Sequence, residues 1–185
     1  RELIISIFEK ASGGRLLYNY FWVGGLMADV HSDFKKDVKE AIAIIRETND
    51  EIMDLLIENK IFVERTADIG VLPADVAINF GCSGPMLRGS GVPYDVRKAA
   101  PYSIYDRFDF EIPVGKVEKG TVGDCWDRNI VRMREMEQSC RIIEQALEQM
   151  PDEGDVQENV PKRVKVPKGE IYMKAENPKG ELGFY

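Results

Sequence analysis

The chain has 185 residues, 31% of which are charged, and a formal net charge of −7. This length is enough for one domain with a hydrophobic core, and no apolar run reaches the roughly 20 residues that cross a bilayer. The acidic balance argues against nucleic acid as a partner, because phosphate binding needs clustered Lys and Arg, and three cysteines at unrelated spacings favour a reducing compartment.

The first predicted element is a helix over 2–11, where apolar residues recur every three or four positions until Gly13-Gly14 ends the pattern. The next stretch, 15–23, carries aliphatic and aromatic residues with little polar alternation. Such a run is typical of a buried strand or extended segment, or of a surface that a partner covers. We favour the core interpretation.

A long amphipathic helix is predicted over 33–59, with Ser32 as its N-cap, because apolar residues at spacings of three and four face away from the charged ones. Residues 61–63 are expected to form a short strand or an extended connector. A short helix is predicted over 73–79, since Pro73 suits a first helical turn.

The segment 81–98 is predicted to be a loop, because it contains the helix and strand breakers Gly84, Pro85, Gly89, Gly91 and Pro93. It also carries a dense set of charges, namely Arg88, Asp95, Arg97 and Lys98. Loops with fixed turns are frequent sites of function, and this makes the four residues candidates. A surface loop with solvated charges is the alternative.

Charged and apolar residues alternate over 107–112, which predicts a strand with one buried face within 102–114. A second long amphipathic helix follows over 124–150, capped by Asp124 and stopped by Pro151. The segment 151–167, which includes most of the basic run 162–168, is interpreted as a linker. Two short strands are expected within 168–185, around the turn at 177–178.

The expected architecture is therefore mainly α within an α+β class: a helical bundle with two long amphipathic helices and small β pieces. Its predicted divisions are a helical core over 1–150 with the charged loop 81–98, the linker 151–167 and the start of a C-terminal β segment over 168–185. Familiar phosphate loops, dinucleotide motifs and cysteine pairs for metals do not occur in the sequence. The single histidine, His31, is expected at the surface of a helix start, so the residues alone predict no catalytic set and no metal site.

Several separated segments nevertheless resemble one known family. They are Arg1-Glu2, Ser12-Gly-Gly-Arg15, Asn19-Tyr20 with Val23-Gly-Gly25, Glu64-Arg-Thr66, Leu87 to Lys98, Gly123 to Arg128, Pro167 to Glu170 and Gly180 to Gly183. In this order they resemble the D subunit of the proton-pumping NADH-quinone oxidoreductase, respiratory complex I. The block Leu87 to Lys98 is the most specific of them, and the resemblance extends over the whole chain.

This resemblance implies a fold related to the large subunit of nickel–iron hydrogenases. It also implies that the chain, together with a small iron–sulfur subunit, forms a quinone-reduction chamber in the peripheral arm, on the cytoplasmic side of the cell membrane. Quinone is then the substrate of the complex, and NAD(H) and the iron–sulfur clusters belong to other subunits. The membrane is contacted only through the complex, and the chain alone is expected to be inactive.

The resemblance transfers only partly to individual residues. The His and Tyr that meet the quinone headgroup in the family precede Arg1, so we expect a central fragment that lacks both ends. Family members often have a histidine at Leu17 and an Arg followed by a small residue or Pro at Trp22 and Val23, and all three differ here. The candidates for chamber walls or a partner interface are Tyr20, Trp22, Val23, Gly24, Arg88, Asp95, Arg97 and Lys98.

Two further expectations concern charge and function. We expect Arg88 and Arg97 to form buried charge-assisted pairs, one with Asp95 and one with a partner subunit. Two other function classes stay open. The first is the large subunit of a membrane-bound nickel–iron hydrogenase or related energy-converting oxidoreductase, which would need Cys-x-x-Cys pairs near the chain ends. The second is a helical interaction module without a redox role.

Overall fold

The structure is a computed structural model that describes residues 1–161, 163 and 165–185. Residues 162 and 164, in the expected linker and basic run, lie outside the described residues. The described chain divides into two compact units, one formed by 1–45 and 147–169 and the other by 46–146 and 170–185. Two of the boundaries fall inside the two long helices and the third falls between residues 169 and 170. The predicted division into 1–150, 151–167 and 168–185 stays a prediction.

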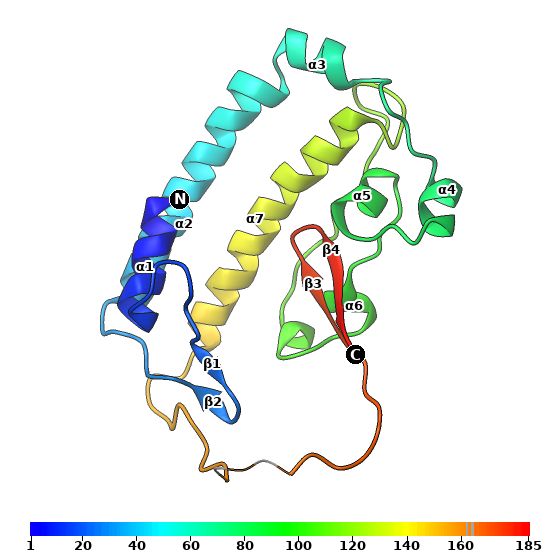
Figure 1. The fold of residues 1–185 in the computed structure, drawn as a ribbon. Coiled ribbons are helices and arrows are strands. Elements are labelled where there is room, and N and C mark those ends of the chain that lie inside the picture. The colour runs from blue at the N-terminus through cyan, green and yellow to red at the C-terminus, as the bar shows by residue number, and fades with distance from the viewer. Residues whose placement is uncertain (162, 164) are drawn as a thin grey trace. The chain divides into compact units, whose positions relative to one another are not determined.

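The first unit contains the N-terminal helix and a small β-hairpin (Figure 1). Helix α1 spans Glu2–Ser12, and it ends as predicted at Gly13, which has a φ of 75° and donates its N–H to the carbonyl of Glu9. Strands β1 (Phe21–Trp22) and β2 (Gly25–Leu26) are antiparallel. A bridge between Gly25 and Gln157 adds part of the expected linker to this hairpin.

The apolar run 15–23 is exposed within the chain, so the favoured core interpretation is wrong. Its large side chains Leu16, Leu17, Phe21 and Val23 are between 71% and 87% exposed. The hairpin has two residue pairs, Phe21 with Leu26 and Trp22 with Gly25. No other element among the described residues of this unit covers the apolar side chains. Apolar content predicted burial, but it could not say which molecule supplies the covering surface.

The first long helix is confirmed, with one irregularity. Helix α2 covers Phe34–Ile52 and continues as the π-helical turn η1 (Met53–Ile57). The segment predicted as extended, 61–63, is instead part of helix α3 (Lys60–Thr66). Asn59 caps this helix by accepting a hydrogen bond from the N–H of Ile61 at 2.9 Å, and this local cap decides the conformation over the apolar residues.

The segment 81–98 contains two short helices, which corrects the prediction of a loop. Helix α4 (Ala74–Asn79) precedes it as expected, and α5 (Gly84–Gly89) and α6 (Val96–Ala99) lie within it. The breakers stand at helix ends rather than in helix interiors: Pro85 is in the first turn of α5, and Gly91 has a φ of +85° after its end. Breakers at these positions delimit short helices and do not prevent them.

The alternating segment 107–112 buries one face as predicted but does not join a sheet. After the 3-10 turn η2 (Tyr105–Arg107), Phe108 and Phe110 are buried while the residues between and after them are exposed. The backbone N–H groups of Asp109 and Glu111 donate to the side chains of Gln145 and Gln138 at 2.8 and 2.9 Å. Side-chain amides of helix α7 thus accept the backbone hydrogen bonds that a neighbouring strand would accept in a sheet.

Helix α7 (Cys125–Gln149) is the longest element of the chain and confirms the second predicted helix (Figure 1). Asp124 caps it, since its carboxylate accepts the N–H of Asp127 at 2.8 Å. One core cluster of the second unit packs Trp126, Ile130 and Met133 against Ile57, and another packs Ile142 against Phe108 and Phe110. The helix therefore serves both clusters.

The two C-terminal strands form the antiparallel hairpin β3 (Met173–Asn177) and β4 (Gly180–Phe184), which confirms the predicted turn. Strand β3 contacts α6 and β4 contacts α5. Helices with two small antiparallel sheets confirm the expected α+β class. Among the described residues no helix is both long and apolar enough to span a membrane.

Candidate functional site

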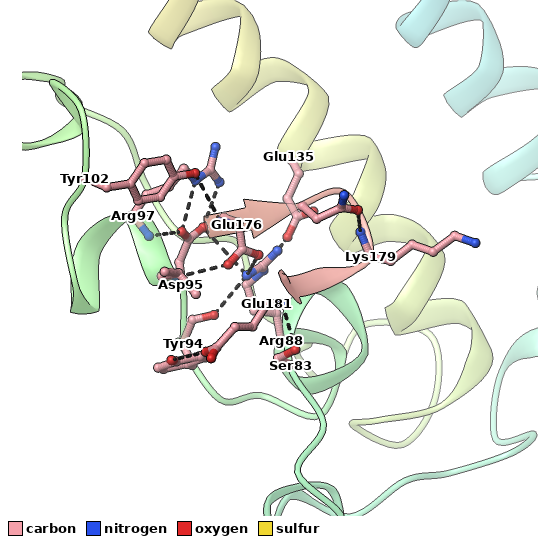
Figure 2. A network of polar contacts seen from close by, with 12 residues as sticks. Ser83, Arg88, Tyr94, Asp95, Arg97, Tyr102, Glu135, Glu176, Lys179 and Glu181 are labelled. Carbon is pink, nitrogen blue, oxygen red and sulfur yellow. Dashed lines mark hydrogen bonds and ion pairs between the residues drawn. The ribbon is translucent and has the colours of Figure 1, made fainter. Parts of the chain in front are cut away.

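Arg88 lies at the centre of a buried polar network in the second unit (Figure 2). It stands in the last turn of α5, and its side chain is only 2% exposed. Its Nη1 donates to the carbonyl of Tyr94 and to Oε1 of Glu176, each at 2.9 Å, and its Nε donates to Glu135. Burial opposes the charged guanidinium, but these carboxylates raise the pKa of Arg88, so it stays a cation.

Asp95 and Arg97 form a forked ion pair at the start of α6. The carboxylate of Asp95 accepts hydrogen bonds from Nε and Nη2 of Arg97 at 3.0 and 2.7 Å. It also accepts a hydrogen bond from the backbone N–H of Arg97 at 2.9 Å. Although burial alone would raise the pKa of Asp95, the hydrogen bonds and charge of Arg97 lower it. Arg88 approaches the same carboxylate at 3.6 Å, so Asp95 lies between two cations.

The C-terminal hairpin completes the network with Glu176 and Glu181. Glu176 bonds to Arg88 through one oxygen and accepts the N–H of Val96 through the other at 3.1 Å, while its own N–H donates to the hydroxyl of Tyr102. The N–H of Glu181 donates to the hydroxyl of Ser83 at 2.9 Å. Residues between 74 and 98 positions apart are thus joined by polar groups.

A shallow pocket lies beside this network. It has a volume of about 540 Å³, and its walls include Cys82, Leu87, Tyr94 and Tyr172. The two tyrosine hydroxyls donate to the same carboxylate, Glu181, at 3.0 and 3.1 Å. The pocket therefore combines aromatic and aliphatic walls with a small group of paired polar atoms.

The expected ion pairs of the two arginines are formed inside the chain. The pair between Arg97 and Asp95 is present as predicted. The prediction also gave one of the two arginines a partner subunit without saying which. Arg88 is buried and paired with Glu135 and Glu176 of the same chain. Lys98 has no ion pair with the network among the described residues, and its Nζ lies 4.2 Å from the ring centroid of Phe110.

The other four candidates stand together in the hairpin of the first unit. The hydroxyl of Tyr20 donates to the carbonyl of Ala28 at 2.7 Å, and partial burial raises its pKa. Trp22 donates from Nε1 to the carbonyl of Asn19 at 2.9 Å and is about half exposed. Val23 is exposed, while Gly24, with a φ of +93°, accepts the N–H of Glu158 at 2.9 Å. The hairpin thus pairs its backbone and leaves its apolar side chains uncovered.

Comparison with known proteins identifies the family. A family model described as the respiratory-chain NADH dehydrogenase, 49 Kd subunit, matches residues 1–165. The chain belongs to this family. It is 52% identical over its whole length to the D subunit of the NADH-quinone oxidoreductase of Chlorobaculum tepidum and 54% identical to that of Chlorobium phaeobacteroides, and it covers 47% of each. It is 49% identical to the D 1 subunit of the NADH-quinone oxidoreductase of Cytophaga hutchinsonii and covers 49% of it, so it spans about half the length of these relatives.

In this member of the 49 Kd subunit family, three glutamates of the network were not predicted from the sequence, namely Glu135, Glu176 and Glu181. Glu135 lies seven positions before Ile142 and four after Val131, both of which are buried, so a glutamate interrupts an apolar stripe of α7. That interruption was a usable signal. Glu176 and Glu181 gave no comparable signal, because charged residues are ordinary in short, partly exposed strands.

Proposed function

We propose that this chain is part of a subunit of a proton-translocating NADH-quinone oxidoreductase, which forms a quinone-reduction chamber together with a small iron–sulfur subunit. Quinone is the substrate of that complex, and NAD(H) and the iron–sulfur clusters belong to other subunits. The subunit lies in the peripheral arm, on the cytoplasmic side of the membrane. The chain contributes a wall and a docking surface and has no activity alone.

The exposed apolar run 15–23, which leads into the N-terminal hairpin and is called the apolar hairpin together with it, is the observation that carries this proposal. Leu16, Leu17, Phe21 and Val23 are each at least 71% exposed. Their neighbour Trp22 is fixed by its hydrogen bond to Asn19, and the backbone of Gly24 and Gly25 is tied to residues 156–158. An ordered backbone that presents contiguous apolar side chains is typical of a surface that a partner buries.

The two groups of candidate residues have different roles in this proposal. The hairpin with Tyr20, Trp22, Val23 and Gly24 is the surface that faces the iron–sulfur subunit. The network of Arg88, Asp95 and Arg97 stabilises the fold of the second unit, because its charges are paired within the chain. The names of the relatives favour a quinone-linked complex over a hydrogenase.

The test is a pull-down of the tagged iron–sulfur subunit with the full-length protein carrying L17D and F21D together. We expect the double variant to lose at least tenfold in co-purification and the membranes to lose quinone reduction by NADH, because two carboxylates cannot be buried in an apolar interface without a large cost. The matched control is V117D, since Val117 is equally exposed but lies in the second unit. Equal co-purification of the double variant and the control would refute the docking surface.

A further inference from the structure

The charges of the buried network are not balanced. Glu181 pairs with Lys174 at 3.5 Å and is left out of the count. Among the described residues, the ion pairs around Arg88 then comprise two guanidinium groups, Arg88 and Arg97, and three carboxyl groups, Asp95, Glu135 and Glu176. If every group were ionised, these five side chains would carry a net charge of −1. All five are largely buried, with exposed fractions of 18% or less. An uncompensated charge in such surroundings is unfavourable, and a buried group commonly avoids it by becoming neutral.

The three carboxyl groups are not equally well compensated. Asp95 accepts three hydrogen bonds from Arg97, one of them from the backbone N–H. Glu176 uses both oxygens, one for Arg88 and one for the N–H of Val96. Within the described residues Glu135 accepts one hydrogen bond, from Nε of Arg88, and no backbone N–H. The least compensated carboxyl group is therefore Glu135.

We propose that Glu135 is a proton-binding site at which the network keeps one exchangeable proton. The proton resides on the carboxyl group of Glu135, and its release to water leaves the network with one excess negative charge. Because the Glu135 side chain is 18% exposed, the proton has a route to solvent, unlike one bound to Asp95, which is 2% exposed. This proposal goes beyond the proposed function and does not depend on it.

The groups that face Glu135 support this assignment. Arg88 from α5 and Arg97 from α6 favour its ionised form, and Asp95 disfavours it, while Glu176 from β3 competes for the same guanidinium. On α7 itself, Ser139 donates its hydroxyl to the backbone carbonyl of Glu135 and not to the carboxylate. Burial raises the pKa of Glu135, and the hydrogen bond from Arg88 offsets this only in part.

The test uses infrared difference spectra of the assembled complex during a pH titration. A protonated carboxyl group absorbs at the carbonyl stretch of an acid, whereas a carboxylate does not. We expect a carbonyl band with the intensity of one carboxyl group to disappear as the pH rises, with a midpoint above the usual glutamate pKa of about 4.3. The E135Q variant should lack this band. Glutamine keeps an oxygen that can accept the bond from Arg88.

The matched control is E137Q, two positions along the same helix, because Glu137 is about 40% exposed and pairs with Arg46. It should leave the band unchanged. A band that persists in E135Q, or no band above the usual glutamate midpoint, would overturn the proposal. If E135Q does not assemble, E135D must shift the band, and an unshifted band refutes the assignment. Normal quinone reduction in a variant without the band would leave the proposed function intact.

Discussion

The charged network of the second unit and the apolar hairpin of the first invert the usual placement of polar and apolar residues. Arg88 and Asp95 are each 2% exposed, whereas Leu16, Leu17 and Phe21 are each more than 80% exposed. Charged groups enter the interior because each finds a partner of opposite charge or a backbone group there. Apolar groups stay outside because the described unit supplies nothing to cover them.

This contrast separates what the chain can satisfy by itself from what it leaves to other molecules. The polar groups of the network are paired across α5, α6, α7 and the C-terminal hairpin (Figure 2). The side chains of the N-terminal hairpin gain little from folding, so their apolar area remains available for association at roughly 25 cal/mol per Å² buried. Stability should therefore depend on the network and assembly on the hairpin.

The largest effect is expected from Arg88→Met. Methionine fills similar space but leaves the buried carboxylate of Glu176 without its cation and Glu135 without its hydrogen-bond donor, and breaking a buried pair by removing one partner costs about 3–5 kcal/mol. The free energy of unfolding from a denaturant titration measures this loss. The control is Arg134→Met, because the pair of Arg134 with Glu118 is about one-third exposed on both sides and should contribute less than about 1 kcal/mol. Equal losses in the two variants would mean that the network does not hold the unit together.

A smaller effect is expected from Gly84→Ala, where α5 meets the C-terminal hairpin. A Cβ at Gly84 would lie 2.4 Å from Cα of Gly180, and its φ is +63°. The left-handed conformation costs roughly 1–2 kcal/mol and the overlap about 1–3 kcal/mol more. Gly81→Ala isolates the first cost, since Gly81 has a φ of +68° but open space around its Cβ position. Calorimetry should show a larger fall in the melting temperature for Gly84→Ala than for Gly81→Ala. An equal fall in the two variants would contradict the close approach of the C-terminal hairpin to α5.

The pH dependence of stability gives a third test. The lowered pKa of Asp95 means that the folded chain binds this proton less tightly than the unfolded chain, so its stabilising effect is present above about pH 3.9 and is lost as the pH falls through the folded pKa. D95N should therefore reduce the free energy of unfolding more at neutral pH than at acid pH. D109N is the control, because its carboxylate is 85% exposed and should change stability by less than about 0.5 kcal/mol at either pH. A pH-independent loss in D95N would contradict the ion pair.

The sequence predicted the elements whose causes are local. Four features follow from a few neighbouring residues: the end of α1 at Gly13, the start of α4 directly after Pro73, the cap of α7 at Asp124 and the turn of the C-terminal hairpin. The division of the chain and the roles of the candidate residues stay predictions, because they depend on contacts far along the sequence or outside it. Family membership came from motif order, not from composition.

The errors arose where distant residues decided the outcome. The alternating segment 107–112 buries Phe108 and Phe110 as a strand would, but its hydrogen bonds go to Gln138 and Gln145 of α7, which no local pattern reveals. The block 81–98 was predicted as a loop because glycine and proline break helix interiors, although here they mark helix ends. Arg88, Asp95 and Arg97 of this block lie in the buried network, but the acidic partner Glu135 lies 47 positions beyond Arg88.

The smallest stability effect is expected at the hairpin, and it sharpens the contrast most directly. Leu17→Ala removes a side chain that is 87% exposed, so the free energy of unfolding should change by no more than about 0.5 kcal/mol. Leu87→Ala makes the same substitution at a side chain that is 5% exposed and should cost about 2–5 kcal/mol. For assembly we expect the opposite order, with a larger loss of partner binding in Leu17→Ala than in Leu87→Ala, because of the two leucines only Leu17 is exposed to a partner. A large unfolding loss in Leu17→Ala, measured by denaturant titration, would show that the run 15–23 is core after all.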